Sequence, residues 1–429
     1  MKRRPFTLVV FTSLSGALGA ASLATTSSSC TSSNSTPPAD AGTGDTSVPD
    51  ATIPDGNVSD ATPPPDGAVA DASKGDGEAG AVSQVVTPTL LFANSAEAGA
   101  ANVDPNLVNP WGLAFNAAGV AWVNDERTGV ATVYRSGATA AALTVTIPAP
   151  AAADAGAISR PTGIVFNHAS ADFKGDTFIF ATLDGTISGW QASFDVATSA
   201  QIRVDNSAGL PTQNQVYTGL ALLATSPGVL LAANFRKGTI DVFDAIYAQL
   251  TPSAGAWTDP SVPAGYAPFN VVALGSTVYV AYAQQDPTKT LGMPGGGAGA
   301  VSAFDLTGKL LRSVVSQVDG GALNAPWGVA WAPASWGALG GDLLVGNFGN
   351  GWINAYNPAT GAFLGHLVGA SGQPIAFSGL WSLEFPIAYA ADGGTVTEID
   401  AGDASLPLYF TAGPALGTEG LFGTLSVSP

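Results

Sequence analysis

The sequence has very few of the residues on which most metal sites and much enzyme chemistry depend. Its 429 residues include one cysteine and two histidines. A single cysteine excludes an intramolecular disulfide scaffold, and so few cysteines and histidines exclude a zinc cluster. The same scarcity excludes most histidine-based acid–base catalysis. We expect the two histidines, His168 and His366, to be structural or exposed.

Positive charge is scarce as well. Lys and Arg number 14 against 32 Asp and Glu, so the formal net charge is −18, and only 11% of residues are charged. An acidic chain is not attracted to nucleic-acid phosphates or anionic lipid headgroups, so we expect neither as a partner. Glycine (53) and proline (30) are abundant and 46% of residues are hydrophobic, which indicates a folded protein rich in turns.

Residues 1–30 resemble an export signal of the lipoprotein type. Lys2, Arg3 and Arg4 precede a weakly apolar run over 6–24, and Cys30 follows shortly after that run. Ser, Thr and Gly dilute the run, which is typical of a signal and not of a membrane span. We therefore predict lipidation of Cys30 and a place in the cell envelope, facing the periplasm or the cell surface. The alternative is a cysteine that is lost when the signal is cleaved.

Residues 31–83 form a low-complexity segment of Ala, Asp, Pro, Ser, Thr and Gly without aromatic side chains. Its Asp residues occur singly, about five positions apart, which is too sparse for a calcium-binding loop. Such a composition buries too little apolar surface to offset the entropy lost on ordering, so it predicts a disordered tether. The chain thus divides into a signal (1–30), a tether (31–83) and a folded region (84–429).

The folded region repeats one unit six times. A first signature, a turn followed by an apolar strand, is clearest in Pro110-Trp111-Gly112 and Pro326-Trp327-Gly328. Weaker copies place Thr162, Thr218, Phe269 and Trp381 at the position of the first tryptophan, so the repeat step is 51–58 residues. A second signature is a glycine, then an apolar residue two positions on and usually an aromatic three positions later. It recurs at 129–134, 185–190, 238–243, 299–304 and 351–356, and more weakly at 420–425.

Each unit holds about four short apolar strands separated by glycine-rich turns, and no helical periodicity is present. Units of this kind are typical of β-propeller blades, so the sequence predicts an all-β fold, a six-bladed propeller over 84–429. The last unit lacks an outer strand, whereas residues 89–93 form a spare apolar strand before the first unit. We predict that this spare strand completes the last blade and closes the ring, which removes an exposed sheet edge.

Segments 104–112, 184–190, 266–270, 346–351 and 408–413 carry a resemblance to a known group of proteins. In their order and content they resemble an uncharacterised family of exported bacterial six-bladed propellers, relatives of the NHL-repeat and gluconolactonase-like propellers. The resemblance extends from about residue 84 to the C-terminus. It implies the same fold and export, but no activity. Residues 386–405 are additional to the pattern, so the sixth unit departs from it most.

In such a propeller, the turns before the first strands and the loops after the second strands meet at one end of the axis. Aromatic faces beside amide groups would suit a sugar or a peptide segment. The alternative is that the rings are wedges between blades and that the Asn residues form turns. The predicted ligand-binding residues are Trp111, Asn124, Asn234, Phe269, Asn270, Trp327, Asn347 and Trp381.

The sequence therefore predicts a monomeric, non-catalytic binding module without a cofactor. Its partner would be a glycan or peptide ligand or another envelope protein, with the membrane contacted only through the lipid anchor. The alternative is a gluconolactonase-like lactone or ester hydrolase with one divalent cation, such as calcium, on the axis. The glutamate that this family places at the start of the first inner strand is missing. The oxygen ligands would come from Asn124, Asp125, Asn234, Asn270 and Asn347.

Overall fold

The computed structural model describes residues 83–208, 214–317, 321–386 and 406–427. The predicted signal, Cys30, the tether before residue 83 and nearly all of the segment 386–405 lie outside the described residues. The described chain is all-β and repeat-like, as the sequence predicted. Among these residues, no helix is long and apolar enough to cross a bilayer.

Most strands belong to four-stranded antiparallel sheets in which neighbours in sequence are neighbours in space. The first sheet is β3 (Pro110–Phe115), β4 (Ala121–Asp125), β5 (Val130–Tyr134) and β6 (Leu143–Thr146). The second is β7 (Pro161–Phe166), β8 (Phe178–Thr182), β9 (Thr186–Trp190) and β10 (Gln201–Asp205). The third is β11 (Tyr217–Leu223), β12 (Val229–Asn234), β13 (Thr239–Phe243) and β14 (Gln249–Leu250). The fourth is β15 (Tyr266–Leu274), β16 (Thr277–Gln284), β17 (Gly299–Asp305) and β18 (Leu310–Gln317).

A nine-stranded sheet joins two further groups of strands through β1 (Gln84–Ala93). β1 pairs antiparallel with the last strand, where Thr89 lies opposite Thr424 and Ala93 opposite Leu421. The spare strand thus has the partner that the sequence predicted. β1 also pairs in parallel with β22 and with the short β2 (Asn102–Val103). One group is β19 (Pro326–Trp331), β20 (Leu343–Asn347), β21 (Ile353–Tyr356) and β22 (Phe363–Val368); the other is β23 (Leu380–Glu384), β24 (Leu408–Ala412) and β25 (Leu421–Val427).

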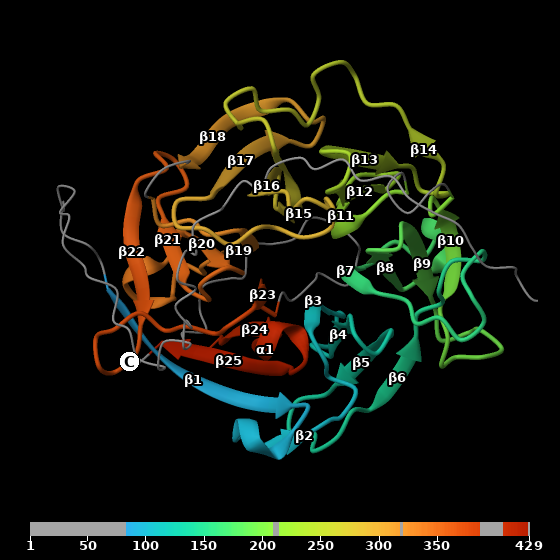
Figure 1. Cartoon of the computed structure of the whole chain (residues 1–429), viewed down its shortest axis with the longest axis horizontal. Coiled ribbons are helices and arrows are strands. Elements are labelled where there is room, and N and C mark those ends of the chain that lie inside the picture. The colour runs from blue at the N-terminus through green and yellow to red at the C-terminus, as the bar shows by residue number, and fades with distance from the viewer. Residues whose placement is uncertain (1–82, 209–213, 318–320, 387–405, 428–429) are drawn as a thin grey trace, which may run out of the picture. The chain divides into compact units, whose positions relative to one another are not determined.

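The sheets follow one another around a common centre, and the first strand of each is innermost (Figure 1). Each inner strand touches the next, in the order β3, β7, β11, β15, β19 and β23, and β23 touches β3. Short helical turns lie between strands at Ala96–Ala98, Phe173–Gly175, Gly337–Leu339 and α1 (Pro414–Gly417). The succession of inner strands therefore closes on itself.

Glycine in the inner strands is required by this close approach. A Cβ on Gly112 would collide with the carbonyl oxygen of Thr162 in the next inner strand, and one on Gly163 would collide with the backbone of Leu220. The first signature therefore requires glycine at this position, because the backbones of neighbouring inner strands are in contact. Between the sheets, large rings fill the space; Trp122 stacks on Phe178 with ring centroids 4.0 Å apart. Burying such a side chain contributes about 1.5–3 kcal/mol.

Candidate functional site

The turns before the inner strands and the loops after the second strands lie at the same end of the sheets. The register places Pro110 opposite Asp125, Pro161 opposite Thr182 and Pro326 opposite Asn347. Because each pair joins the start of a first strand to the end of a second strand, one end of the ring carries all of the predicted site residues. We call it the tryptophan end.

Four predicted aromatic residues meet at the centre of the tryptophan end. Trp111 stacks on Trp381 with ring centroids 3.6 Å apart and meets Trp327 edge-on at 6.2 Å. Phe269 lies 5.9 Å from Trp381 and 6.3 Å from Trp111. All four side chains are buried. We call these four residues the aromatic plug; they converge as predicted, but their faces are covered and act as packing surface.

The polar atoms of the plug are mostly bonded within the protein. Trp327 Nε1 donates to the carbonyl oxygen of Thr218 at 3.0 Å, and Trp381 Nε1 donates to Asn109 Oδ1 at 2.9 Å. Trp111 Nε1 is buried without a partner among the described residues. Half-buried Phe348 stacks on Trp381 with ring centroids 4.3 Å apart.

Two of the predicted amides connect neighbouring sheets. Asn124 Nδ2 donates to the carbonyl oxygens of Thr162 and Gly163, both at 3.0 Å, across the gap between the first and second sheets. Asn270 Nδ2 donates to the carbonyl oxygen of Trp327 at 2.9 Å, across the gap between the fourth sheet and β19. Both side chains are buried. Their N–H groups are therefore used inside the protein, because inner-strand carbonyls need buried donors, and their role as ligand contacts stays a prediction.

The other two amides are buried as well. Asn234 Nδ2 donates to Asp241 Oδ2 at 2.9 Å, and Asn347 Nδ2 donates to the carbonyl oxygen of Ala322 at 2.8 Å. Their role as ligand contacts stays a prediction.

The oxygen ligands that the metal hypothesis requires do not converge. The side-chain oxygens of Asn270 and Asn347 accept backbone N–H groups of Val271 and Asn324, at 2.9 and 3.1 Å. Asn124 and Asp125 are consecutive in a strand, so their side chains point to opposite faces. In the described part of the chain, no group of three or more His, Cys, Asp or Glu is placed to hold a metal. These residues therefore do not fit a shared cation on the axis.

Asp125 is a fully buried acid at this end. Its Oδ2 accepts a hydrogen bond from Thr132 Oγ1 at 2.8 Å, while its Oδ1 has no partner among the described residues. Burial raises the pKa of Asp125 well above its usual range, and the nearby Asp104 carboxylate raises it further. The carboxyl group therefore holds its proton at pH values where an exposed aspartate is ionised.

A second buried acid, Glu126, is the centre of a network that sequence reasoning did not select. Its Oε1 accepts a hydrogen bond from Arg160 Nε at 2.5 Å. Its Oε2 accepts one from Asn109 Nδ2 at 2.8 Å and lies 3.3 Å from Arg127 Nε. Glu126 is 1% exposed, whereas Arg127 and Arg160 are 51% and 42% exposed. Because Asn109 also bonds Trp381, the network links the aromatic plug to the surface.

Beside this network the backbone is held in an uncommon conformation. Within α1, Ala415 and Leu416 have φ values of 50° and 57°, in the left-handed region that non-glycine residues seldom adopt. Arg127 Nη2 donates to the carbonyl oxygen of Leu416 at 3.3 Å. Leu416 is 95% exposed. Strain of this kind persists only where the surroundings enforce it, and it is concentrated at functional sites.

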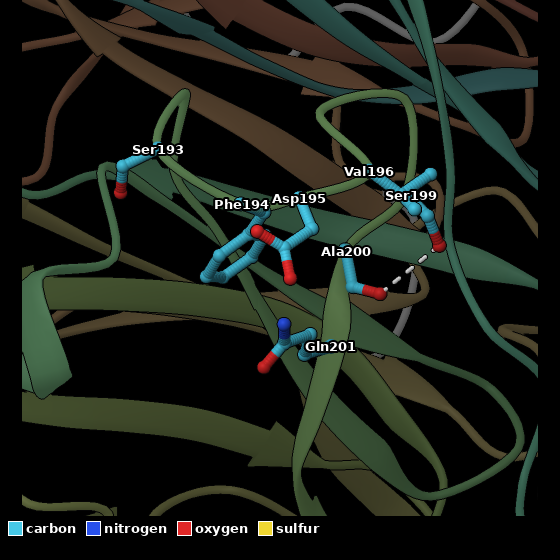
Figure 2. Close-up of a pocket in the computed structure, with 7 residues that line it drawn as sticks. All are labelled: Ser193, Phe194, Asp195, Val196, Ser199, Ala200 and Gln201. Carbon is cyan, nitrogen blue, oxygen red and sulfur yellow. Dashed lines mark hydrogen bonds between the residues drawn. The ribbon is translucent and has the colours of Figure 1, made fainter. Parts of the chain in front are cut away.

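A hollow of about 370 Å³ lies elsewhere, at the connection between β9 and β10 (Figure 2). The strand direction places it at the end opposite the tryptophan end. It contains none of the predicted site residues, and Ser199 Oγ, one of its polar groups, donates to the carbonyl oxygen of Ala200 at 3.2 Å. The lining residues are Ser193, Phe194, Asp195, Val196, Ser199, Ala200 and Gln201.

The fold and this end define a ring-like, repeat-containing all-β protein with an aromatic centre. No family model matches the chain. It is 32% identical over 295 residues to the uncharacterized protein R648 of Acanthamoeba polyphaga mimivirus, covering 66% of this chain and 70% of the relative. It is 30% identical over 294 residues to the uncharacterized protein L690 of the same virus, covering 66% and 75%. A third mimivirus protein, R640, is 30% identical over 207 residues, covering 48% of this chain and 37% of the relative.

The chain therefore belongs to the family that includes these mimivirus proteins R648 and L690. The resemblance to an exported bacterial family related to NHL-repeat propellers is wrong, since the relatives found are viral and no family model matches. The reason is physical. Closely spaced inner strands require the glycine of the Pro-x-Gly turns. These turns therefore indicate how the strands pack and are weak evidence of common ancestry.

Proposed function

We propose that the described region is a closed six-bladed β-propeller and that it acts as a monomeric, non-catalytic binding module. Four four-stranded sheets, the group β19–β22 and the group formed by β23, β24, β25 and β1 support six blades. The contact between β23 and β3 supports closure. A crystal structure with another number of sheets around the axis would contradict this arrangement.

The observation that carries the binding proposal is how the tryptophan end is built. The aromatic plug fills its centre, so a ligand would meet a surface and not a channel. That surface offers Arg127, Arg160 and Leu416 above a buried base of rings and hydrogen-bonded amides. Side chains oriented by a rigid, buried support are what a binding surface requires. The hydrolase alternative has weaker support, because its candidate oxygen ligands bond the protein's own backbone.

Leu416→Asp tests the binding function. Ligands are first identified on an array of peptides and glycans. We expect the variant to bind each of them about tenfold or more weakly, since it removes the most exposed apolar group of this surface. Thermal melting should stay unchanged, because aspartate tolerates the left-handed backbone better than leucine does. Binding is measured by titration of each ligand found.

The matched control is Val196→Asp, an exposed apolar residue (61%) at the hollow on the opposite end. Loss of binding in Val196→Asp with binding retained in Leu416→Asp would move the site to that hollow. Turnover of any member of a lactone and ester panel would favour the hydrolase. The absence of any ligand on the array would reject the binding function.

We further propose that the chain is exported and anchored through Cys30. The basic start, the apolar run and the lone cysteine support it. Cys30→Ser is expected to move the protein from the membrane to the soluble fraction of the producing cells, because the thiol that would carry the lipid is lost. Ser29→Ala should stay with the membrane. If Cys30→Ser sediments with membranes as before, lipidation at this position is wrong.

A further inference from the structure

We infer that Arg127 and Arg160 form an anion-recognising pair, and that their ligand is an acidic peptide segment in which a carboxylate lies beside an aliphatic side chain. The inference rests on the proposed binding function and adds the class of ligand. It is carried by the geometry of the two guanidinium groups, by their shared buried partner and by the side chain exposed next to them.

Glu126 forms ion pairs with both arginines, and each guanidinium also makes one hydrogen bond within the protein. Arg160 uses Nε to bond Glu126, while its Nη1 and Nη2 donate to no described residue. Arg127 places Nε 3.3 Å from Glu126 and uses Nη2 for the Leu416 carbonyl oxygen, which leaves Nη1 without a partner in the described part of the chain. A guanidinium is planar and its N–H groups form a rigid fork, so the hydrogen bonds at Arg160 Nε and at Arg127 Nη2 fix the direction of the remaining N–H groups.

The remaining N–H groups match a carboxylate. Two guanidinium groups share one buried carboxylate, so their positive charge is only partly compensated by Glu126. Asp184 is a second acid beside Arg160: its Oδ2 accepts the backbone N–H of Arg160 at 2.8 Å, and its carboxylate interacts electrostatically with the guanidinium. Among the described residues, no hydrogen bond joins this carboxylate to Nη1 or Nη2 of Arg160, so these N–H groups stay available to a ligand. Arginine forks bind carboxylates through paired, charge-assisted hydrogen bonds, which are stronger than neutral ones.

The neighbouring apolar group favours a peptide over a glycan. Arg127 bonds the carbonyl oxygen of Leu416, an exposed residue whose aliphatic side chain suits another aliphatic residue. A sugar ring would instead stack on an exposed aromatic face. The faces of Trp111, Trp327 and Trp381 are buried in the plug. An acidic glycan would thus find the arginines, but none of the three plug tryptophans would be open for stacking.

The ligand class is tested by fluorescence anisotropy with the whole purified chain. The probe is a labelled peptide of alternating leucine and aspartate; the comparison ligands are its leucine–asparagine counterpart and an oligogalacturonate. We expect the leucine–aspartate peptide to bind about tenfold or more tightly than either, since only it offers carboxylates next to aliphatic groups. Equal binding of the two peptides would overturn the role of the carboxylate, and tighter binding of the oligogalacturonate would overturn the peptide class.

The residues are tested with Arg160→Gln and Arg127→Gln. Each should weaken binding of the leucine–aspartate peptide about tenfold or more, and Arg160→Lys should be intermediate because it keeps the charge but loses the fork. The control is Arg135→Gln, an exposed arginine in the turn after β5 at the opposite end. Thermal melts identify any variant that unfolds. If both Gln variants bind as the parent does, the arginine site is rejected, while ligand binding lost in Leu416→Asp would still sustain the proposed function.

Discussion

Replacing Trp381 with alanine is expected to lower the free energy of unfolding by about 3–5 kcal/mol. Its ring stacks on Trp111 and on Phe348, with centroids 3.6 and 4.3 Å apart, and meets Trp327 edge-on at 6.0 Å. Closely spaced inner strands surround the plug, so the backbone cannot collapse far into the space left by the ring. Equilibrium unfolding in urea measures the loss.

Trp331→Ala is the matched control. Trp331 is 37% exposed and its Nε1 bonds the carbonyl oxygen of Gly341 at 2.8 Å, so its truncation removes the same side chain without opening the core. We expect a clearly smaller loss than for Trp381→Ala. Equal losses in the two variants would contradict the plug as the main packing centre of this end. Trp381→Phe should lie between them, because it keeps a ring but removes the donor to Asn109.

The sequence predicted the strands well because their signals are local. β3, β7 and β19 begin at Pro110, Pro161 and Pro326, the prolines of the first signature. Proline there begins the strand, and the glycine two positions later allows the next inner strand to approach. The partner of residues 89–93 was predictable too, since the last unit holds one strand fewer than the others and so has one sheet edge to fill.

The candidate site was only partly predictable, because burial and partners between sheets depend on distant segments. Residue types and repeat positions indicated that the tryptophans converge, but not that four neighbouring amides would be buried. Glu126 and Arg160 are 34 residues apart and belong to successive units. The sequence did contain a signal for this contact, since Glu126 follows a second strand and Arg160 precedes a first strand at the same end. Local pattern alone does not indicate which of several polar loop residues will meet.

Asp176→Ala is expected to cost about 3–5 kcal/mol of stability, because it leaves a mostly buried arginine without its counter-charge. Asp176 is fully buried, and the side chain of Arg203 is 11% exposed. Arg203 Nη2 donates to Asp176 Oδ1 and Arg203 Nε donates to Asp176 Oδ2, both at 2.6 Å. Tyr247, from the third sheet, donates its hydroxyl to Asp176 Oδ2 at 2.7 Å. The carboxylate thus connects the second and third sheets. Equilibrium unfolding in urea measures the loss of stability.

A double-mutant cycle separates the ion pair from simple loss of packing. Arg203→Met keeps much of the side chain's length and volume, so in Asp176→Ala/Arg203→Met no charge is left buried. We expect this double variant to be more stable than the sum of the two single losses predicts, since the cost of an unpaired charge is counted in each single variant. Strictly additive losses would show that Asp176 and Arg203 do not stabilise each other. In that case the hydrogen bond from Tyr247 would account for the effect of Asp176, and Tyr247→Phe should then reproduce most of it.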